Sequence, residues 1–235
     1  MATTIINSGD DGTVRQNSAT SYQAAVNGSG NGGFNFFNQT THLFNAFIGH
    51  LCSRVYIRFD TTGIATDQVA TGATIVLTLE GTRGATDDNS EIHKFFISTD
   101  HTSTFASGLY DTIGDAASDE VDVGNTLGST STFTLDSTGI AYINTQIAAG
   151  DECAFLLRCH ADYDDPTTNA TGVNFRTFRD FEESTTSLRP KITITHDTGA
   201  GASGFGHNVL GVASANIGSI NGIATANFGK VNTVD

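Results

Sequence analysis

The residues with the clearest potential for chemistry form an acidic cluster, Asp162-Tyr163-Asp164-Asp165, which follows a strongly apolar run. Carboxylate oxygens are the ligands that Ca²⁺ prefers, and Asp162, Asp164 and Asp165 supply several at close spacing. Tyr163 adds an aromatic ring that could contact a sugar ligand. The EF-hand spacing is absent, however, and Ca²⁺ takes about six or more oxygens. A ligand loop and a solvated acidic loop both stay open, and the solvated loop is the favoured interpretation.

No spacing typical of a catalytic site is present. The seven histidines show neither an HxH nor an HExxH arrangement, so a zinc site would have to be assembled from distant parts of the chain. A GxSxG nucleophile elbow is absent, and the segment 28–33, Gly-Ser-Gly-Asn-Gly-Gly, lacks the lysine of a phosphate-binding loop. The sequence therefore predicts a non-enzymatic protein with no cofactor. Ca²⁺ in the acidic loop is the alternative.

Charge restricts the partners that the chain can bind. The 25 acidic and 11 basic residues give a formal net charge of -14. Such a surface repels phosphate backbones and anionic headgroups, which excludes nucleic acid and membrane surfaces as expected partners. The N-terminal residues lack the basic and apolar regions of an export signal, and no apolar stretch reaches the ~18–20 residues of a membrane span. We expect a protein made without an export signal, with a removed signal as the alternative.

The three cysteines are expected to be free, buried thiols. Cys153 and Cys159 lie six positions apart in one apolar run, so on a single strand they would be ~20 Å apart and could not be bridged. Cys52 could pair with either of them across a sheet, which is the alternative.

The elements that must position these residues are mostly strands. Short runs alternate between apolar and polar residues, and the run 153–159 is almost continuously apolar, as expected of a central strand buried on both faces. Ile140, Ile143 and Ile147 instead follow helical spacing, and Gly150 is placed to end that helix. We predict a single all-β domain, a jelly-roll β-sandwich, over residues 1–196. The other strands are expected at 54–60, 73–80, 92–97, 132–135, 173–178 and 191–195.

The composition changes after this domain. Residues 197–210 are rich in Gly, Ala and Ser and predict a flexible linker. Residues 211–235 hold an eleven-residue repeat, in which Gly-Val-Ala-Ser-Ala-Asn-Ile-Gly-Ser-Ile-Asn is followed by Gly-Ile-Ala-Thr-Ala-Asn-Phe-Gly-Lys-Val-Asn. Two copies cannot build their own core, so the tail must pack on something else. Each copy contains two glycines, which disfavours a helix, and we expect an extended or turn-rich tail. Its predicted assembly residues are Val212, Ile217, Ile220, Ile223, Phe228, Val231 and Val234.

Several segments of the domain resemble one known family, DNRLRE (disaggregatase-related) jelly-roll domains, and occur in the order seen there. They are Val55-Tyr-Ile-Arg-Phe-Asp-Thr-Thr-Gly-Ile64, Ala73-Thr-Ile-Val-Leu-Thr-Leu-Glu80, Gly139-Ile-Ala-Tyr-Ile-Asn144, Asp151-Glu-Cys-Ala-Phe-Leu-Leu-Arg158, Val173-Asn-Phe-Arg-Thr-Phe-Arg-Asp-Phe-Glu182 and Arg189-Pro-Lys-Ile-Thr-Ile-Thr-His196. The resemblance covers about residues 10–196. The stretch 176–183 departs from the family signature. The resemblance implies a sandwich related to carbohydrate-binding modules, which are usually accessory domains without catalysis.

The tail resembles a different group of proteins. Asn221-Gly-Ile-Ala-Thr-Ala-Asn-Phe-Gly-Lys-Val-Asn232 is similar to C-terminal repeats on structural proteins of tailed bacteriophages. Together these resemblances imply a bacteriophage virion protein, a capsid decoration or a tail or fibre component, assembled in bacterial cytoplasm. Its expected partners are other virion proteins and itself, as a homo-oligomer and by guess a trimer. The alternative is an extracellular carbohydrate-binding module that binds a cell-surface glycan. The absence of Trp, with only five Tyr to serve as sugar platforms, weighs against this alternative.

Overall fold

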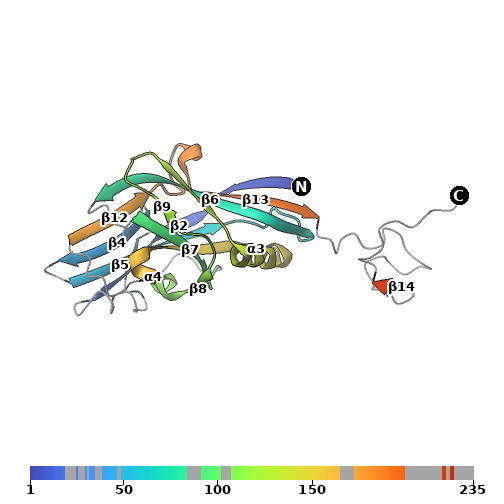
Figure 1. Ribbon diagram of the computed structural model, residues 1–235, viewed down its shortest axis with the longest axis horizontal. Coiled ribbons are helices and arrows are strands. Elements are labelled where there is room, and N and C mark those ends of the chain that lie inside the picture. Colours follow the sequence, from blue (N-terminus) through green and yellow to red (C-terminus); the bar gives the residue numbers. More distant parts are fainter. Residues whose placement is uncertain are drawn as a thin grey trace.

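The chain folds as a sandwich of two antiparallel β-sheets (Figure 1). The computed structural model describes residues 1–18, 25, 30, 32–34, 39–46, 49–83, 91–101, 107–164, 172–198, 219–220 and 223–224. Within these ranges strands predominate, so the predicted all-β class and sandwich architecture are confirmed. None of the helices in these ranges is long and apolar enough to cross a membrane.

The first sheet has its N-terminal strand at one edge. Its order is β1, β13, β6 and β10, and every pairing is antiparallel. The first and last strands of the sandwich therefore lie side by side, as Figure 1 shows. The four strands are β1 (Ala2–Asn7), β13 (Lys191–Thr198), the first part of β6 (Gln68–Arg83) and β10 (Thr130–Thr134).

The second sheet is centred on β5 (Gly49–Phe59). One side of β5 pairs with β2 along its length, and the other side pairs first with β4 and then with β11. The last residues of β6 pair with β12, so β6 passes from one sheet into the other. The remaining strands are β2 (Asp10–Ser18), β3 (Gly32–Phe34), β4 (Gln39–Ala46), β7 (Ile92–Ser98), β8 (Ile113–Ala116), β9 (Val121–Asp122), β11 (Cys153–Cys159) and β12 (Gly172–Phe178).

The main core fills the space between the sheets. Alternate residues of facing strands contribute to it, as strand geometry requires, and Phe95 packs edge-on against Phe133 with ring centroids 4.9 Å apart. Phe155 of β11 joins this cluster, while its neighbours Ala154 and Leu156 face a second apolar cluster on the opposite side of the sheet. Every residue of β11 is buried, which confirms the prediction of a central strand covered on both faces.

The predicted helix is present as α3 (Ser137–Ala149). The carboxylate of Asp136 accepts hydrogen bonds from the amides of Thr138 and Gly139 at its start, and Gly150 ends it in the left-handed conformation at φ 69°. Ile143 and Ile147 are both buried in the main core. The spacing of apolar residues and the terminal glycine therefore located this helix correctly.

The second apolar cluster is covered by two short helical segments, η1 (Ser107–Asp111) and α4 (His160–Tyr163). Tyr56 and Tyr110 are fully buried in it, and the Tyr110 hydroxyl donates to the carbonyl of Ala25. The central sheet is thus buried on both faces, on one side by the first sheet and on the other by these segments.

Several expectations need correction or fall outside the described residues. Strands β1, β2, β3, β4, β8 and β9 were not predicted, and β13, the last strand of the sandwich, ends at Thr198. In the tail, only β14 (Ser219–Ile220) and β15 (Ile223–Ala224) are described, paired with Ile220 opposite Ile223. The predicted linker from residue 199 lies outside the described residues, as do the assembly residues Val212, Ile217, Phe228, Val231 and Val234.

Candidate functional site

The acidic cluster predicted as a ligand loop begins inside the protein rather than on its surface. The structure has a helical turn, α4, where a loop was expected, and the side chain of Asp162 is 0 % exposed. Arg54 of β5 donates from Nε and Nη2 to the two carboxylate oxygens of Asp162, both at 2.8 Å. Arg158 at the end of β11 donates from Nε to the same carboxylate at 2.8 Å. Asp162 is therefore an internal counter-ion for two arginines.

Each arginine of this cluster is also held by other groups. Arg54 donates from Nη1 to the carbonyl of Tyr110 at 2.7 Å, and its guanidinium carbon lies 3.8 Å from the centroid of the Tyr110 ring. Arg158 donates from Nη2 to the backbone carbonyl of Asp162 at 2.6 Å and lies over the ring of Phe96. The cluster ties β5, β11, α4 and η1 together. We call Arg54, Arg158 and Asp162 the arginine–aspartate triad.

The electrostatics of the triad keep Asp162 ionised. Burial alone would raise the pKa of its carboxyl group, but the charges and hydrogen bonds of Arg54 and Arg158 outweigh burial and hold that pKa well below its ordinary value. Removing any one of these three groups would leave a buried charge without its partner and would destabilise the fold.

This geometry leaves Asp162 without an oxygen for a cation. Both of its carboxylate oxygens and its carbonyl face arginine donors. Asp164 points outward, with a side chain 68% exposed, and contacts His160 at 3.2 Å. Asp165 lies outside the described residues. Among the described residues, no group of three His, Cys, Asp or Glu side chains is placed to hold a metal ion.

Tyr163, the aromatic member of the predicted ligand loop, is half-buried. Its ring packs against Phe96 and His160, with centroids 5.5 and 5.4 Å away. Burial raises the pKa of its hydroxyl, and the nearby Glu120 raises it further. Most of the described tyrosines make internal contacts. Tyr56 and Tyr110 are fully buried, and the Tyr142 hydroxyl accepts a hydrogen bond from the amide of Ala154.

A second buried ion pair lies where β12 passes the start of β7. Arg176, 0 % exposed, donates to Glu91 Oε1 at 3.0 Å and to the carbonyls of Gly124 and Phe175. His93 is fully buried beside it, with Nδ1 2.9 Å from the carbonyl oxygen of Glu91. Arg176 belongs to the stretch that departs from the DNRLRE signature, and the structure gives it an internal contact.

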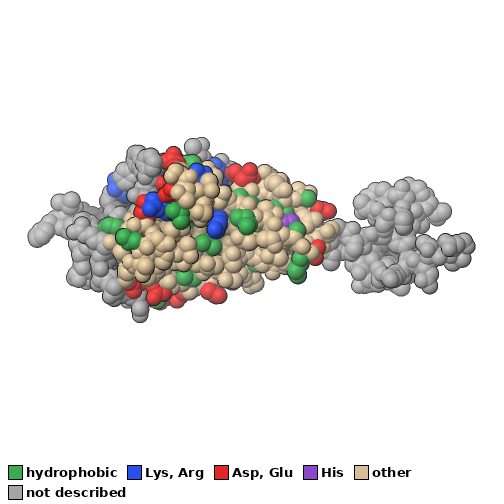
Figure 2. All heavy atoms as spheres, turned by 90° about the horizontal axis from the view of Figure 1, so that it is seen from above, with side chains coloured by type: hydrophobic (Ala, Val, Ile, Leu, Met, Phe, Trp, Pro, Cys, Tyr) green, Lys and Arg blue, Asp and Glu red, His purple; other side chains and the backbone are tan. Residues whose placement is uncertain are grey.

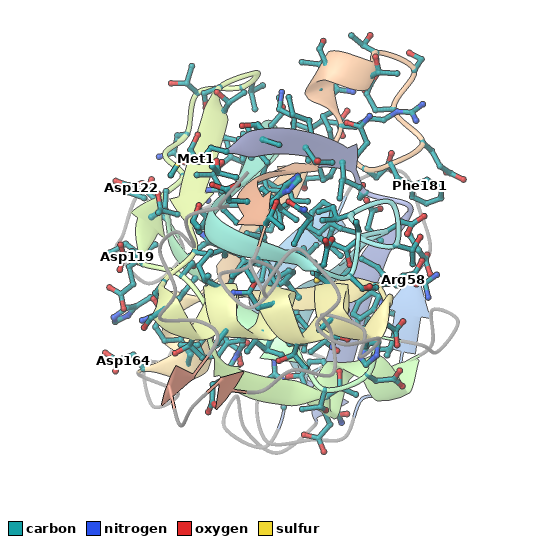
Figure 3. All side chains as sticks on the ribbon, turned by 90° about the vertical axis from the view of Figure 1, so that its right-hand side faces the viewer. Met1, Arg58, Asp119, Asp122, Asp164 and Phe181 are labelled. Atoms are coloured by element: carbon teal, nitrogen blue, oxygen red, sulfur yellow. The ribbon has the colours of Figure 1, made fainter. Side chains whose placement is uncertain are left out.

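A third group of charges lies at the rim of the central sheet. Arg58 contacts Asp10 at 3.2 Å and Glu152 at 3.1 Å, which joins β5 to β2 and to the residue before β11. Burial raises the pKa of Asp10, and Arg58 partly offsets this. Figure 3 shows Arg58 on one side of the molecule, with Asp119, Asp122 and Asp164 along the opposite side. These three aspartates therefore lie away from this rim.

The similarity of this chain to known proteins is weak. No family model matches the chain, and no curated protein matches it. Among solved structures, the chain is similar to the K1 cleaved adhesin domain of Lys-gingipain from Porphyromonas gingivalis W83, at a TM-score of 0.31 and 14% sequence identity. That alignment covers 82% of this chain and 89% of the adhesin domain. A similarity at this level does not transfer a ligand or a partner. The resemblances to DNRLRE domains and to phage repeats stay predictions.

Sequence reasoning did not find the triad. Arg54 and Asp162 are 108 positions apart, and no local pattern links them. One signal was available, because Arg158 is a charged residue inside an otherwise apolar run. A charge in a buried strand needs a partner, and the nearest carboxylate that follows on the next helical turn is Asp162.

Proposed function

We propose that this chain is a non-enzymatic component of an assembled particle, a bacteriophage virion, on which it serves as a capsid decoration or as part of a tail or fibre. The sandwich would be the displayed domain, and residues 211–235 would attach it to other virion proteins. The observation that carries the proposal is the eleven-residue repeat that follows the last strand of the sandwich.

The strand pairing at the end of the sandwich supports separate roles for the domain and the tail. β13 lies between β1 and β6, so the last strand of the domain already has a neighbour on each side. Among the described residues, the main core is formed by the sandwich strands, α3 and the segments next to them. We propose that the repeats contact other chains.

The described part of the tail supports the need for a partner. β14 and β15 pair over two residues each, and the intervening sequence Asn221-Gly222 is the favoured two-residue hairpin connection. A hairpin of this size is not stable alone in water. Contact with another surface would supply the missing stabilisation.

The buried ionisable groups support a role without catalysis. The arginines of the two buried ion-pair clusters are held by carboxylates and backbone carbonyls of the same chain. These contacts hold elements in place.

The direct test is the composition of purified particles. Quantitative mass spectrometry should find this chain in a fixed ratio to a major capsid or tail protein. Its absence from particles would refute the proposal. Glycan-array binding that is lost in Tyr163→Ala would replace the proposal with a carbohydrate-binding module.

A paired substitution tests the tail itself. Ile220→Asn with Ile223→Asn should abolish attachment of the full-length chain to particles, because two apolar contacts are lost. Ile220→Val with Ile223→Val keeps the apolar, β-branched character and should attach normally. Thermal unfolding of the sandwich should be the same in both. Equal attachment of the two variants would show that these positions do not mediate assembly.

A further inference from the structure

The outward face of the first sheet carries a regular array of threonines. In β1, β13, β6 and β10 the alternate residues such as Ile75, Phe133 and Ile192 are buried, so the intervening residues point away from the core. One row across the sheet is formed by register neighbours: Ile5 lies opposite Thr193, Thr193 opposite Thr74, and Thr74 opposite Thr134. We call the outward side chains of these four strands, up to Val76 of β6, the threonine face.

The rows on either side of this one have the same character. Thr132 lies opposite Val76, which lies opposite Lys191. Thr3 lies opposite Thr195. Threonine and valine are β-branched and have few rotamers, so this surface loses little side-chain entropy when another surface packs on it.

The threonine face is almost uncharged on a strongly acidic chain. In the four strand segments that form it, only Lys191 and Asp197 are charged, whereas the whole chain has a net charge of -14. Asp197 is paired with the N-terminal amine at 3.3 Å. Figure 2 views the molecule from above: much of the described surface is uncharged, and acidic and basic side chains gather toward its left part and its margins.

This face also carries large exposed apolar side chains. Of the four such side chains within the described residues, Ile5 at 65% and Val69 at 41% exposed lie on it, and Met1 at 88% exposed directly precedes β1. Val69 lies opposite Asp197 in the register of β6 and β13, close to the N-terminus. An apolar group on a neutral, rigid face is typical of an interaction surface.

We propose that the threonine face is an interface with a second copy of this chain, packed sheet against sheet. Two copies that each carry a charge of -14 repel one another, and this neutral face is where they can approach with the least repulsion. A two-fold interface brings the same patch from both subunits together, so a face without net charge meets itself without conflict. Threonine methyl groups would interdigitate, and the hydroxyl groups would pair across the interface.

The shape of the sheet favours a second copy over the flat surface of an insoluble polysaccharide. Adjacent strands of an antiparallel sheet are rotated by roughly 20–25°, so a four-stranded face is twisted. A second sheet with the same twist matches that surface, as in the aligned packing of β-sandwiches. The interface goes beyond the proposed function, because it does not involve the tail.

The test uses full-length protein and sedimentation velocity over the micromolar range. The wild type should self-associate, and Thr193→Lys should weaken self-association by about tenfold or more, because it places like charges from both copies in one interface. Thr145→Lys is the matched control: Thr145 is exposed on α3, and the substitution changes the net charge equally. Either lysine makes the chain less acidic, so the overall repulsion between two copies should decrease equally in the two variants. Only Thr193→Lys, which places its charge in the interface, should dissociate.

Two further variants make the result decisive. Thr193→Val keeps the β-branched shape and should retain self-association, and thermal unfolding should show that every variant is folded. A monomeric wild type, or equal association of Thr193→Lys and Thr145→Lys, would overturn the proposal. Ile220→Asn with Ile223→Asn separates it from the role of the tail, since this variant should lose particle attachment but keep the threonine-face interface. If a monomeric wild type bound an insoluble polysaccharide and Thr193→Lys did not, the occupant would be a glycan rather than a second copy.

Discussion

Arg54 donates two parallel hydrogen bonds, both 2.8 Å long, to the carboxylate of Asp162, although 108 positions separate the two residues. The pair joins the central strand of the second sheet to the helical turn that follows β11. Bidentate geometry is the strongest form of this interaction, and here both partners are buried. The acidic cluster thus contributes to the fold through its first residue, while Asp164 remains at the surface.

We predict that Asp162→Asn strongly destabilises the protein. The substitution leaves two buried guanidinium groups without a counter-charge, and the expected loss is about 3–5 kcal/mol in the free energy of unfolding. Chemical denaturation measures this loss. The control is Asp164→Asn, which should change stability by about 0.5 kcal/mol or less because Asp164 is exposed. Similar losses in the two variants would contradict the structural role of the triad.

The same carboxylate gives a pH dependence with a definite sign. The pKa of Asp162 is lower in the folded chain than its ordinary value of 3.8, so its stabilisation is present above that value. The stabilisation is lost as the pH falls below about 4 toward the folded-state pKa. The stability advantage of the wild type over Asp162→Asn should therefore shrink in this acidic range and be constant at neutral pH.

Local sequence patterns were sufficient to identify some elements of the fold and not others. The run 153–159 identified a strand buried on both faces because it is almost continuously apolar. Ile143, Ile147 and Gly150 identified α3 because helical spacing and a left-handed terminus are local properties. β1 and β2 were missed because apolar and buried positions do not coincide in them: β2 buries the polar Asp11 and Thr13, and β1 exposes Ile5. Their partners β13 and β5 are also distant in sequence. Ion pairs between distant elements leave only an indirect signal, the charged Arg158 within an apolar run.

We predict a second pH effect from His93, in a different range. Burial, together with the charge of Arg176, lowers the pKa of His93 from 6.5 to about 4, so the ring stays neutral in the folded chain. Between pH 6.5 and 4 the unfolded chain takes up a proton that the folded chain does not. Stability should therefore fall as the pH drops through this range, by about 3 kcal/mol in total.

The variant His93→Gln isolates this effect because glutamine does not titrate. Its stability, measured by denaturation at a series of pH values, should vary less than that of the wild type between pH 6.5 and 4. Parallel pH profiles for the two proteins would show that His93 is not the group responsible.

Two glycines should respond to alanine for different reasons. A Cβ at Gly139 would overlap the carbonyl oxygen of Ala117 and lie 3.1 Å from Leu135 Cβ, so Gly139→Ala should destabilise by about 1–3 kcal/mol. Gly150 has room for a Cβ but a φ of 69°, and Gly150→Ala should destabilise by about 1–2 kcal/mol through backbone strain. The control is Gly63→Ala, where no atom lies within 4 Å, and stability should stay the same or rise slightly. Thermal unfolding that ranks Gly63→Ala with the other two would contradict this account.

The three cysteines should be unreactive in the folded protein and all reactive after unfolding. Cys52, Cys153 and Cys159 are free and buried. Burial raises the pKa of Cys153 to about 12 and that of Cys159 well above its ordinary value, so neither is a thiolate near neutral pH. A chromogenic disulfide reagent should detect no rapidly reacting thiol in the native chain and, without reductant, three thiols in denaturant. Detection of a single thiol in denaturant would instead show that Cys52 is paired with one of the other two. A thiol that reacts rapidly in the native chain would show that at least one of these sites opens to solvent.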